Sequence, residues 1–255
     1  MFDFGNANDA QKLAISSSNG AVLITAGPGT GKTFTLVQRA IYLIQECGVK
    51  PEQILMATFT EKAAKELVTR ITNELAVRNI YVNVNEMYIG TFHSLCLRII
   101  KDNLEFTQLK KNYRLLDSFD QKYLVFRNIQ KFRNIADIEL VMPNGGAWKW
   151  AEAICGLVGT LTEELVDADA MAKDSKTEIR VLSAILKQYQ QLLTDENLID
   201  FAKIQTECYR LLKENPAILS DLQEKIHYLM IDEYQDTNYI QEQIIFMLGE
   251  KHGNI

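Results

Sequence analysis

The sequence predicts an α/β protein with a P-loop, RecA-like domain, in which a parallel sheet is flanked by helices and interrupted by an inserted all-helical subdomain. Four short apolar runs predict buried strands, because their hydrophobicity is continuous rather than alternating, as in a parallel sheet covered on both faces. These runs are Ala21–Thr25, Ile54–Phe59, Met87–Phe92 and His227–Ile231. The long stretch between the third and fourth runs shows helical patterns instead.

Helical spacing of apolar residues follows each of the first two predicted strands. After the first strand the spaced residues are Leu36, Ala40, Leu43 and Ile44; after the second they are Ala63, Ala64, Leu67, Ile71 and Leu75. Two strand–helix units in a row predict right-handed parallel crossovers, and therefore a parallel sheet.

Helical patterns also fill the region between the third and fourth strands. They cover Gln121–Phe132, Ala147–Val158, Thr177–Leu193 and Phe201–Lys213, with a break at MPNGG, residues 142–146. A structureless connection of this length is rare in a compact domain. We therefore predict a helical insertion at 105–196, between a first part (1–104) and a second part (197–255) of one ATPase-like domain.

Composition narrows the class of protein. With 255 residues, 47% hydrophobic and 24% charged, the chain can form one large globular domain or two modest ones. It has no apolar run of about eighteen residues, and its first residues, MFDFGNANDAQK, lack the order of a secretion signal. We expect a cytoplasmic protein without a membrane partner. The four cysteines are far apart, which predicts neither a zinc site nor a disulfide framework.

Charge is distributed unevenly along the chain. The net charge is −6, but nine Lys or Arg and only four Asp or Glu lie between Arg98 and Arg133. This segment is therefore +5, which leaves −11 for the rest. A local basic surface in an acidic protein can follow a phosphate backbone. A solvated helical face without a ligand explains the segment equally well.

The stretch VLITAGPGTGKT has the order of a phosphate-binding loop, in which a strand ends, glycines follow and a helix begins. Glycines allow the loop to close around phosphates, and the helix directs its positive end at the same anion. Lys32 would contact the β and γ phosphates, and the Thr33 hydroxyl would bind Mg²⁺. A chance glycine turn is the alternative. The predicted nucleotide-binding residues of this loop are Ala26, Gly27, Pro28, Gly29, Thr30, Gly31, Lys32 and Thr33.

A second acidic stretch, LMIDEYQD at Leu229–Asp236, complements the loop. Asp232 follows the end of a predicted strand, which is where ligands bind in open α/β sheets. We predict that Asp232 holds Mg²⁺ and that Glu233 is the general base for the attacking water. An Asp-Glu pair after a strand is commonplace alone, but a phosphate loop makes the combination specific.

Several separated motifs resemble the N-terminal part of superfamily 1 DNA helicases of the UvrD/Rep/PcrA type. NANDAQKLAI resembles that family's opening glutamine motif, and IDEYQDTNYIQ resembles its second ATPase motif. ATFTEKAAKELVTRI and GTFHSLCLRII resemble its two segments that contact single-stranded DNA, and LIDFAKI resembles its short Asp-Phe motif. The resemblance covers most of residues 6–104 and 197–250. It implies that Gln11 reads adenine and that Gln235 and Asp236 link the state of the γ-phosphate to domain closure.

By the same resemblance, two TF-containing segments would line a single-stranded DNA track. Phe59 and Phe92 each end a predicted strand, where an aromatic ring can stack on a base without reading its identity. Core packing is the alternative for these rings. The predicted DNA-binding residues are Thr58, Phe59, Thr60, Thr91, Phe92 and His93.

The family resemblance implies an ATP-dependent DNA helicase that uses ATP and Mg²⁺ and moves 3′ to 5′. Single-stranded DNA and single/double-strand junctions are the expected partners, the latter through the basic residues Lys110, Lys111 and Arg114. The sequence stops before the family's third motif, so we expect a missing C-terminal RecA-like domain and weak or no turnover without it. An ATP-binding DNA-binding or regulatory module without productive turnover is the alternative, and a small-molecule P-loop kinase is disfavoured by the TF segments.

Overall fold

The computed structural model describes residues 2–255, which form two compact units. One, the α/β unit, comprises residues 2–98, 212–237 and 242–255; the other, the helical unit, comprises Ile99–Leu211 and Asn238–Gln241. The predicted fold class, a parallel sheet flanked by helices with a helical insertion, is confirmed. The predicted insertion at 105–196 lies inside the helical unit, whose bounds are wider on both sides.

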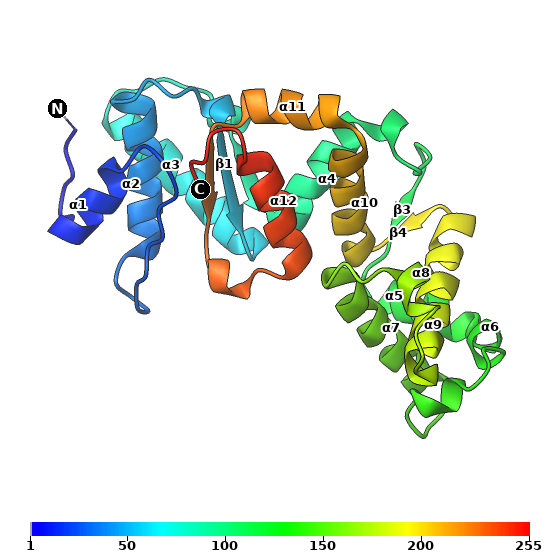
Figure 1. Ribbon diagram of the computed structural model, residues 1–255. Helices are drawn as coiled ribbons and strands as arrows, with labels where there is room; N and C mark the ends of the chain where they lie inside the picture. Colours follow the sequence, from blue (N-terminus) through cyan, green and yellow to red (C-terminus); the bar gives the residue numbers. More distant parts are fainter. Residues whose placement is uncertain (1) are drawn as a thin grey trace. The chain divides into compact units, whose positions relative to one another are not determined.

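The sheet of the α/β unit has three parallel strands in the order β2-β1-β5 (Figure 1). They are β1 (Ile54–Thr58), β2 (Tyr88–Thr91) and β5 (Tyr228–Ile231). All five residues of β1 are buried, because a strand at the centre of a covered sheet exposes neither face. The register aligns Thr58 with Thr91 and Ala57 with Ile231. Three of the four predicted strands and their parallel pairing are thus confirmed.

Helices cover this sheet, and Figure 1 shows α2 and α3 on one side of β1 and α12 on the other. Leu67, Ile71 and Leu75 of α3 are buried at helical spacing against the core that includes Ile54 and Met56. Fully burying one such side chain contributes about 1.5–3 kcal/mol. The helices that lie wholly or partly in this unit are α1 (Asp9–Ser16), α2 (Lys32–Gln45), α3 (Glu61–Val77), α4 (Phe92–Asp102), α10 (Phe201–Glu214), α11 (Pro216–Lys225) and α12 (Tyr239–Gly249).

The first predicted strand, Ala21–Thr25, is wrong: this segment belongs to no strand or helix, and Leu23 is 83% exposed. A strand forms only where a neighbouring backbone supplies hydrogen bonds. Here a cavity of about 660 Å³ lies between residues 21–26 and β5. At one end of it, Val22 N donates to Ile255 O at 2.8 Å and Leu229 N donates to Asn254 O at 2.9 Å. Asn254 and Ile255 thus bond to both segments, and residues 21–26 form no strand beside β5.

The helical unit has its own apolar core, formed largely by α5, α7 and α9. The predicted helix at 121–132 is divided at Asn128, whose side chain donates to Leu124 O at 3.0 Å and ends α5. The two-residue strands β3 (Arg114–Leu115) and β4 (Leu198–Ile199), which the sequence did not predict, pair in parallel. The helices are α5 (Ser118–Arg127), α6 (Ile129–Arg133), α7 (Ala147–Glu163), α8 (Ala168–Met171) and α9 (Thr177–Asp195), with part of α4, α10 and α12.

None of the helices described in residues 2–255 is both long and apolar enough to cross a membrane.

Residues 23–25, which belong to no strand, should exchange their amide hydrogens much faster than the paired centre of the sheet. We expect Leu23–Thr25 to exchange at least ~100-fold faster than Leu55–Ala57, because the β1 amides open only when the sheet itself opens. Hydrogen–deuterium exchange read by NMR or mass spectrometry measures both segments in one sample. Equal protection of the two segments would contradict the structure in this region.

Candidate functional site

The glycine-rich loop contains two glycines in a conformation that other residues rarely adopt. Gly29 and Gly31 have φ values of +74° and +90°, in the left-handed region where other residues are strained. A Cβ on Gly31 would lie only 2.9 Å from the Gln11 side-chain nitrogen. Helix α2 begins at Lys32, directly after the loop, so its positive end faces the loop residues.

Gln11 connects α1 to this loop through a side-chain hydrogen bond. Its amide oxygen accepts from Asn8 N at 2.9 Å, and Asn8 Oδ1 accepts from Gln11 N at 2.9 Å, which is a reciprocal capping box. The Gln11 side-chain nitrogen then donates to Thr30 O at 3.1 Å. The Asn-x-x-Gln spacing in the sequence could have revealed the cap, but the contact with Thr30 depends on the fold.

Lys32 and Glu233 form an ion pair across the site, with 3.0 Å between Nζ and Oε2. The Gln235 side chain donates to the same oxygen at 2.7 Å. These hydrogen bonds, from Gln235 first and Lys32 second, hold the pKa of Glu233 below its usual range. Glu233 has a φ of +52°, an uncommon conformation for a residue with a side chain. The structure thus brings the glycine loop and the acidic motif, which are far apart in the sequence, into direct contact.

Asp232 lies at the carboxyl end of β5, where its backbone N donates to Ala57 O at 2.9 Å. Burial raises the pKa of Asp232, and the neighbouring Glu233 carboxylate raises it further. Within residues 2–255 no group of three or more His, Cys, Asp or Glu could hold a metal. A hydroxyl from Thr33 and a carboxylate from Asp232 nonetheless suit Mg²⁺, which binds few protein oxygens and completes its shell with phosphate oxygens and water.

The cavity of about 660 Å³ reaches this site, since Lys32, Asp232 and Glu233 contribute to its lining. Arg39, which no sequence motif indicated, lines it too. Arg39 is 5% exposed, and its guanidinium donates to Ala14 O at 2.6 Å. Burial lowers the pKa of Arg39. In the sequence, an arginine among the apolar residues of α2 could have indicated a buried cation.

The two TF segments meet at the carboxyl edge of the sheet, because Thr58 and Thr91 are aligned in neighbouring strands. Their hydroxyls are used internally: Thr58 Oγ1 donates to Thr60 O at 3.1 Å, and Thr91 Oγ1 donates to Glu61 Oε1 at 3.2 Å. Phe59 stands out from this edge with 52% of its surface exposed.

The remaining residues of the predicted DNA track differ in their accessibility. Thr60 is exposed and caps α3, its hydroxyl accepting from Ala63 N at 3.1 Å. Phe92 and His93 are half-buried at the start of α4, and burial lowers the pKa of His93, which favours its neutral form. Phe59 and Thr60 are therefore the predicted residues most open to a ligand.

Tyr234 and Glu242 provide a further contact beside the acidic motif. The Tyr234 hydroxyl donates to Glu242 Oε1 at 2.6 Å. This hydrogen bond, together with burial, raises the pKa of Tyr234 to about 12, so the hydroxyl stays protonated and fixes the start of α12 relative to the motif.

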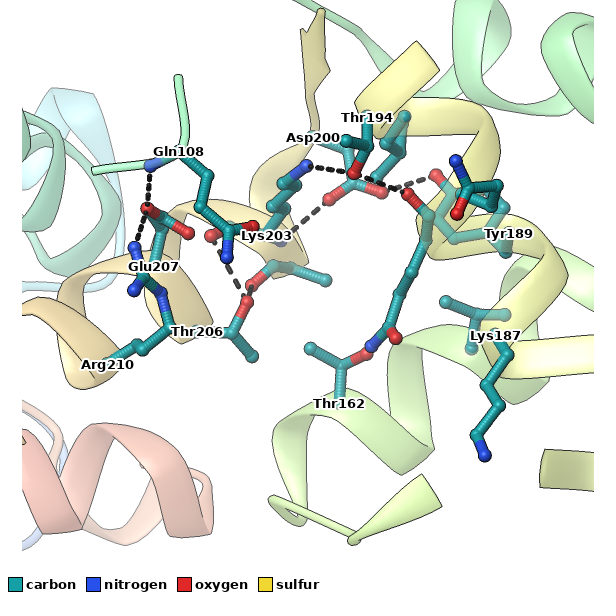
Figure 2. Close-up of a pocket in the computed structure, with 15 residues that line it drawn as sticks. Gln108, Thr162, Lys187, Tyr189, Thr194, Asp200, Lys203, Thr206, Glu207 and Arg210 are labelled. Carbon is teal, nitrogen blue, oxygen red and sulfur yellow. Dashed lines mark hydrogen bonds and ion pairs between the residues drawn. The ribbon is translucent and has the colours of Figure 1, made fainter. Parts of the chain in front are cut away.

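A second cavity, of about 520 Å³, lies within the helical unit, and Figure 2 shows Tyr189, Asp200 and Lys203 around it. Asp200 is 2% exposed and accepts from the Gln121 side chain at 3.0 Å, from Lys203 N at 2.7 Å and from the Tyr189 hydroxyl. Asp200 therefore ties α5, α9 and α10 together. The aspartate of the LIDFAKI motif is thus a structural acceptor in this fold.

Comparisons with known proteins agree with these motifs. The family model described as UvrD/REP helicase N-terminal domain matches residues 7–255. The chain is 35% identical over 248 residues to the ATP-dependent DNA helicase Rep of Buchnera aphidicola subsp. Acyrthosiphon pisum, covering 97% of this chain and 36% of that protein. It is 31% identical over 249 residues to the ATP-dependent DNA helicase PcrA of Bacillus subtilis, covering 97% and 32%. The chain spans about a third of the length of these relatives.

Gln235→Ala should raise the pKa of Glu233, because the mutation removes the donor that contributes most to lowering it. Titration of the Glu233 carboxyl carbon by NMR measures the shift toward the ordinary value of a glutamate. Gln130→Ala, at an exposed position of the helical unit, is the control and should leave the titration unchanged. A Glu233 titration that is the same in both variants would remove Gln235 from this role.

Proposed function

Because this chain belongs to the UvrD/Rep helicase family as its N-terminal domain, we propose that it is the ATP-binding domain of an ATP-dependent DNA helicase or translocase. The ion pair between Lys32 and Glu233 is the observation that carries this proposal. It brings a P-loop lysine and the acidic motif to one point at the carboxyl edge of the parallel sheet, where ligands bind in α/β folds.

In this proposal, the loop from Ala26 to Thr33 binds the phosphates of ATP, with Gln11 beside it for adenine. When ATP binds, Lys32 leaves Glu233 and pairs with the phosphates, because a triphosphate carries more negative charge than one carboxylate does. Glu233, which Lys32 then releases, accepts a proton from the attacking water. Thr33 and Asp232 would hold Mg²⁺, which supplies neutralisation of phosphate charge when it is bound.

Single-stranded DNA would bind at the same carboxyl edge of the sheet, where β1 and β2 end. Phe59 would stack on a base of single-stranded DNA, with Thr60, Phe92 and His93 beside it. Thr58 and Thr91, whose hydroxyls are bonded internally, would shape this edge through their backbones. Gln235, which contacts Glu233, would link the presence of the γ-phosphate to domain closure, together with Asp236.

The activity of the whole protein is a further step of the proposal. Since the chain spans about a third of its relatives' length, we assign 3′ to 5′ movement and unwinding at single/double-strand junctions to the full-length protein. A second RecA-like domain would complete the ATP site, and the domain alone would turn over ATP weakly or not at all.

Lys32→Ala should abolish binding of ATP and Mg²⁺, because it removes the point charge that contacts the phosphates. Titration with a fluorescent ATP analogue measures this in the 255-residue chain. Lys65→Ala, at an exposed position of α3, is the matched control and should bind as the wild type does.

Glu233→Gln separates binding from hydrolysis in the same assay. It should retain nucleotide binding, while the full-length protein loses single-stranded DNA-stimulated hydrolysis. If the Glu233→Gln enzyme still hydrolyses ATP, Glu233 is not the general base. If Lys32→Ala binds the ATP analogue as well as the wild type does, the glycine loop is not the phosphate site.

Phe59→Ala should weaken binding of single-stranded DNA by about 1–3 kcal/mol with little dependence on sequence, because stacking does not read base identity. Fluorescence anisotropy with labelled oligonucleotides of different sequence measures it. Tyr81→Ala removes another exposed ring of the α/β unit, 88% exposed, and should have no effect. If the two variants bind equally well, Phe59 does not contact the strand.

A further inference from the structure

Four aromatic side chains form an exposed surface on the helical unit, which we call the aromatic surface. Phe119, Tyr123 and Phe126 come from α5 and Trp148 from α7, and their exposed fractions are 61%, 49%, 38% and 37%. The two helices pack against each other (Figure 1). Single exposed apolar residues are normal, but a contiguous patch on a soluble protein indicates an interaction site.

The four rings contact one another in a continuous series. Phe119 and Tyr123 are nearly parallel, at 4° and 6.4 Å between centroids, and Tyr123 and Phe126 are 6.4 Å apart at 25°. Trp148 lies 5.8 Å from Phe119 and 5.6 Å from Phe126. The rings therefore present several flat faces in one place, on rigid helices rather than on a loop.

Core packing does not account for these rings. Residues 119, 123 and 126 follow the i, i+4, i+7 spacing of one helix face, whereas Leu124 and Val125 on the other side of α5 fill the core of the unit. Helix α5 thus has an inward apolar face that folding requires and an outward aromatic face that it does not.

Two lysines adjoin the aromatic surface. Lys122 falls between the ring positions on α5 and reaches Glu152 of α7 at 3.3 Å, and the exposed Lys149 follows Trp148. Along the sequence, the segment Arg98–Arg133, which includes α5, carries +5 in a chain of net charge −6. Aromatic faces combined with a positive segment are the features by which proteins bind single-stranded nucleic acid without sequence preference.

We infer that the aromatic surface is a contact for single-stranded nucleic acid, separate from the sheet edge of the α/β unit. Bases stack on Phe119, Tyr123 and Trp148, and Lys122 and Lys149 attract the phosphates. The inference deepens the proposed function, on which it rests for the kind of strand that the protein meets. It assigns a base-stacking role to the helical unit that the motifs do not provide.

Trp148 reports directly on this surface, because the chain has only two tryptophans. Trp150→Phe leaves Trp148 as the single indole and keeps a ring at a position packed against the core. The experiment titrates this variant of the 255-residue chain with an oligothymidylate and follows Trp148 emission. An oligomer of the same length made of abasic sites presents the same phosphates without bases. We expect quenching by the oligothymidylate and none by the abasic oligomer.

Affinity measured by anisotropy tests the same contact without the tryptophan. The double variant Phe119→Ala/Tyr123→Ala should weaken oligothymidylate binding about fivefold or more. Phe106→Ala, which removes a 50% exposed ring elsewhere in the helical unit, is the matched control and should not weaken binding. Circular dichroism of the variants should match the wild type, since these rings lie outside the core.

The outcomes separate this inference from the proposed function. Unquenched Trp148 with normal oligothymidylate binding that Phe59→Ala weakens would overturn the inference and leave the proposed function standing. Quenched Trp148 with no effect of Phe59→Ala would support the inference and remove the DNA track from the sheet edge. No binding at all would overturn both. Concentration-dependent self-association that the double variant abolishes, without quenching, would assign the surface to a second copy of the chain instead.

Discussion

The parallel pairing of β1 with both β2 and β5 is the constraint on which the candidate site depends. Backbone hydrogen bonds in this register place the ends of three strands at one edge of the sheet. Thr58, Thr91 and Asp232, which are far apart in the sequence, come to that edge as a result. Since β1 is buried along its whole length, a shift of register would expose part of the core. The apolar core thus fixes the position of the polar residues.

The ion pair between Lys32 and Glu233 joins the start of α2 to the residues that follow β5. Both side chains are about a third exposed, so the pair contributes little to stability and is open to exchange with a ligand. The conformation of Glu233, with a positive φ, directs a carboxylate at the loop instead of continuing the strand. Local strain of this kind is typical of functional sites. The buried apolar residues of the strands therefore stabilise this region, while the partly exposed ion pair at the strand ends contributes little to stability.

The helical unit also has a buried interior that stabilises it and an exposed aromatic surface. Asp200 satisfies three donors from three helices, which fixes their relative positions inside the unit. A separate apolar core supplies the remaining stability. The aromatic rings of α5 and α7 take no part in either. They form the exposed aromatic surface, for which we infer a contact with single-stranded nucleic acid.

The sequence by itself determined three strands of the sheet, the helices that follow the glycine loop and β1, and the positions of the glycine loop and the acidic motif, because hydrophobic periodicity and glycine spacing are local properties of the chain. It also placed the break at residues 142–146 and most helices of the insertion. It did not predict that residues 21–26 lie outside the sheet, since strand formation depends on a partner backbone supplied from elsewhere. Nor did it predict that Asp200 is structural or that the rings of α5 face outward. Those properties depend on which residues fold next to each other, and only tertiary packing decides that.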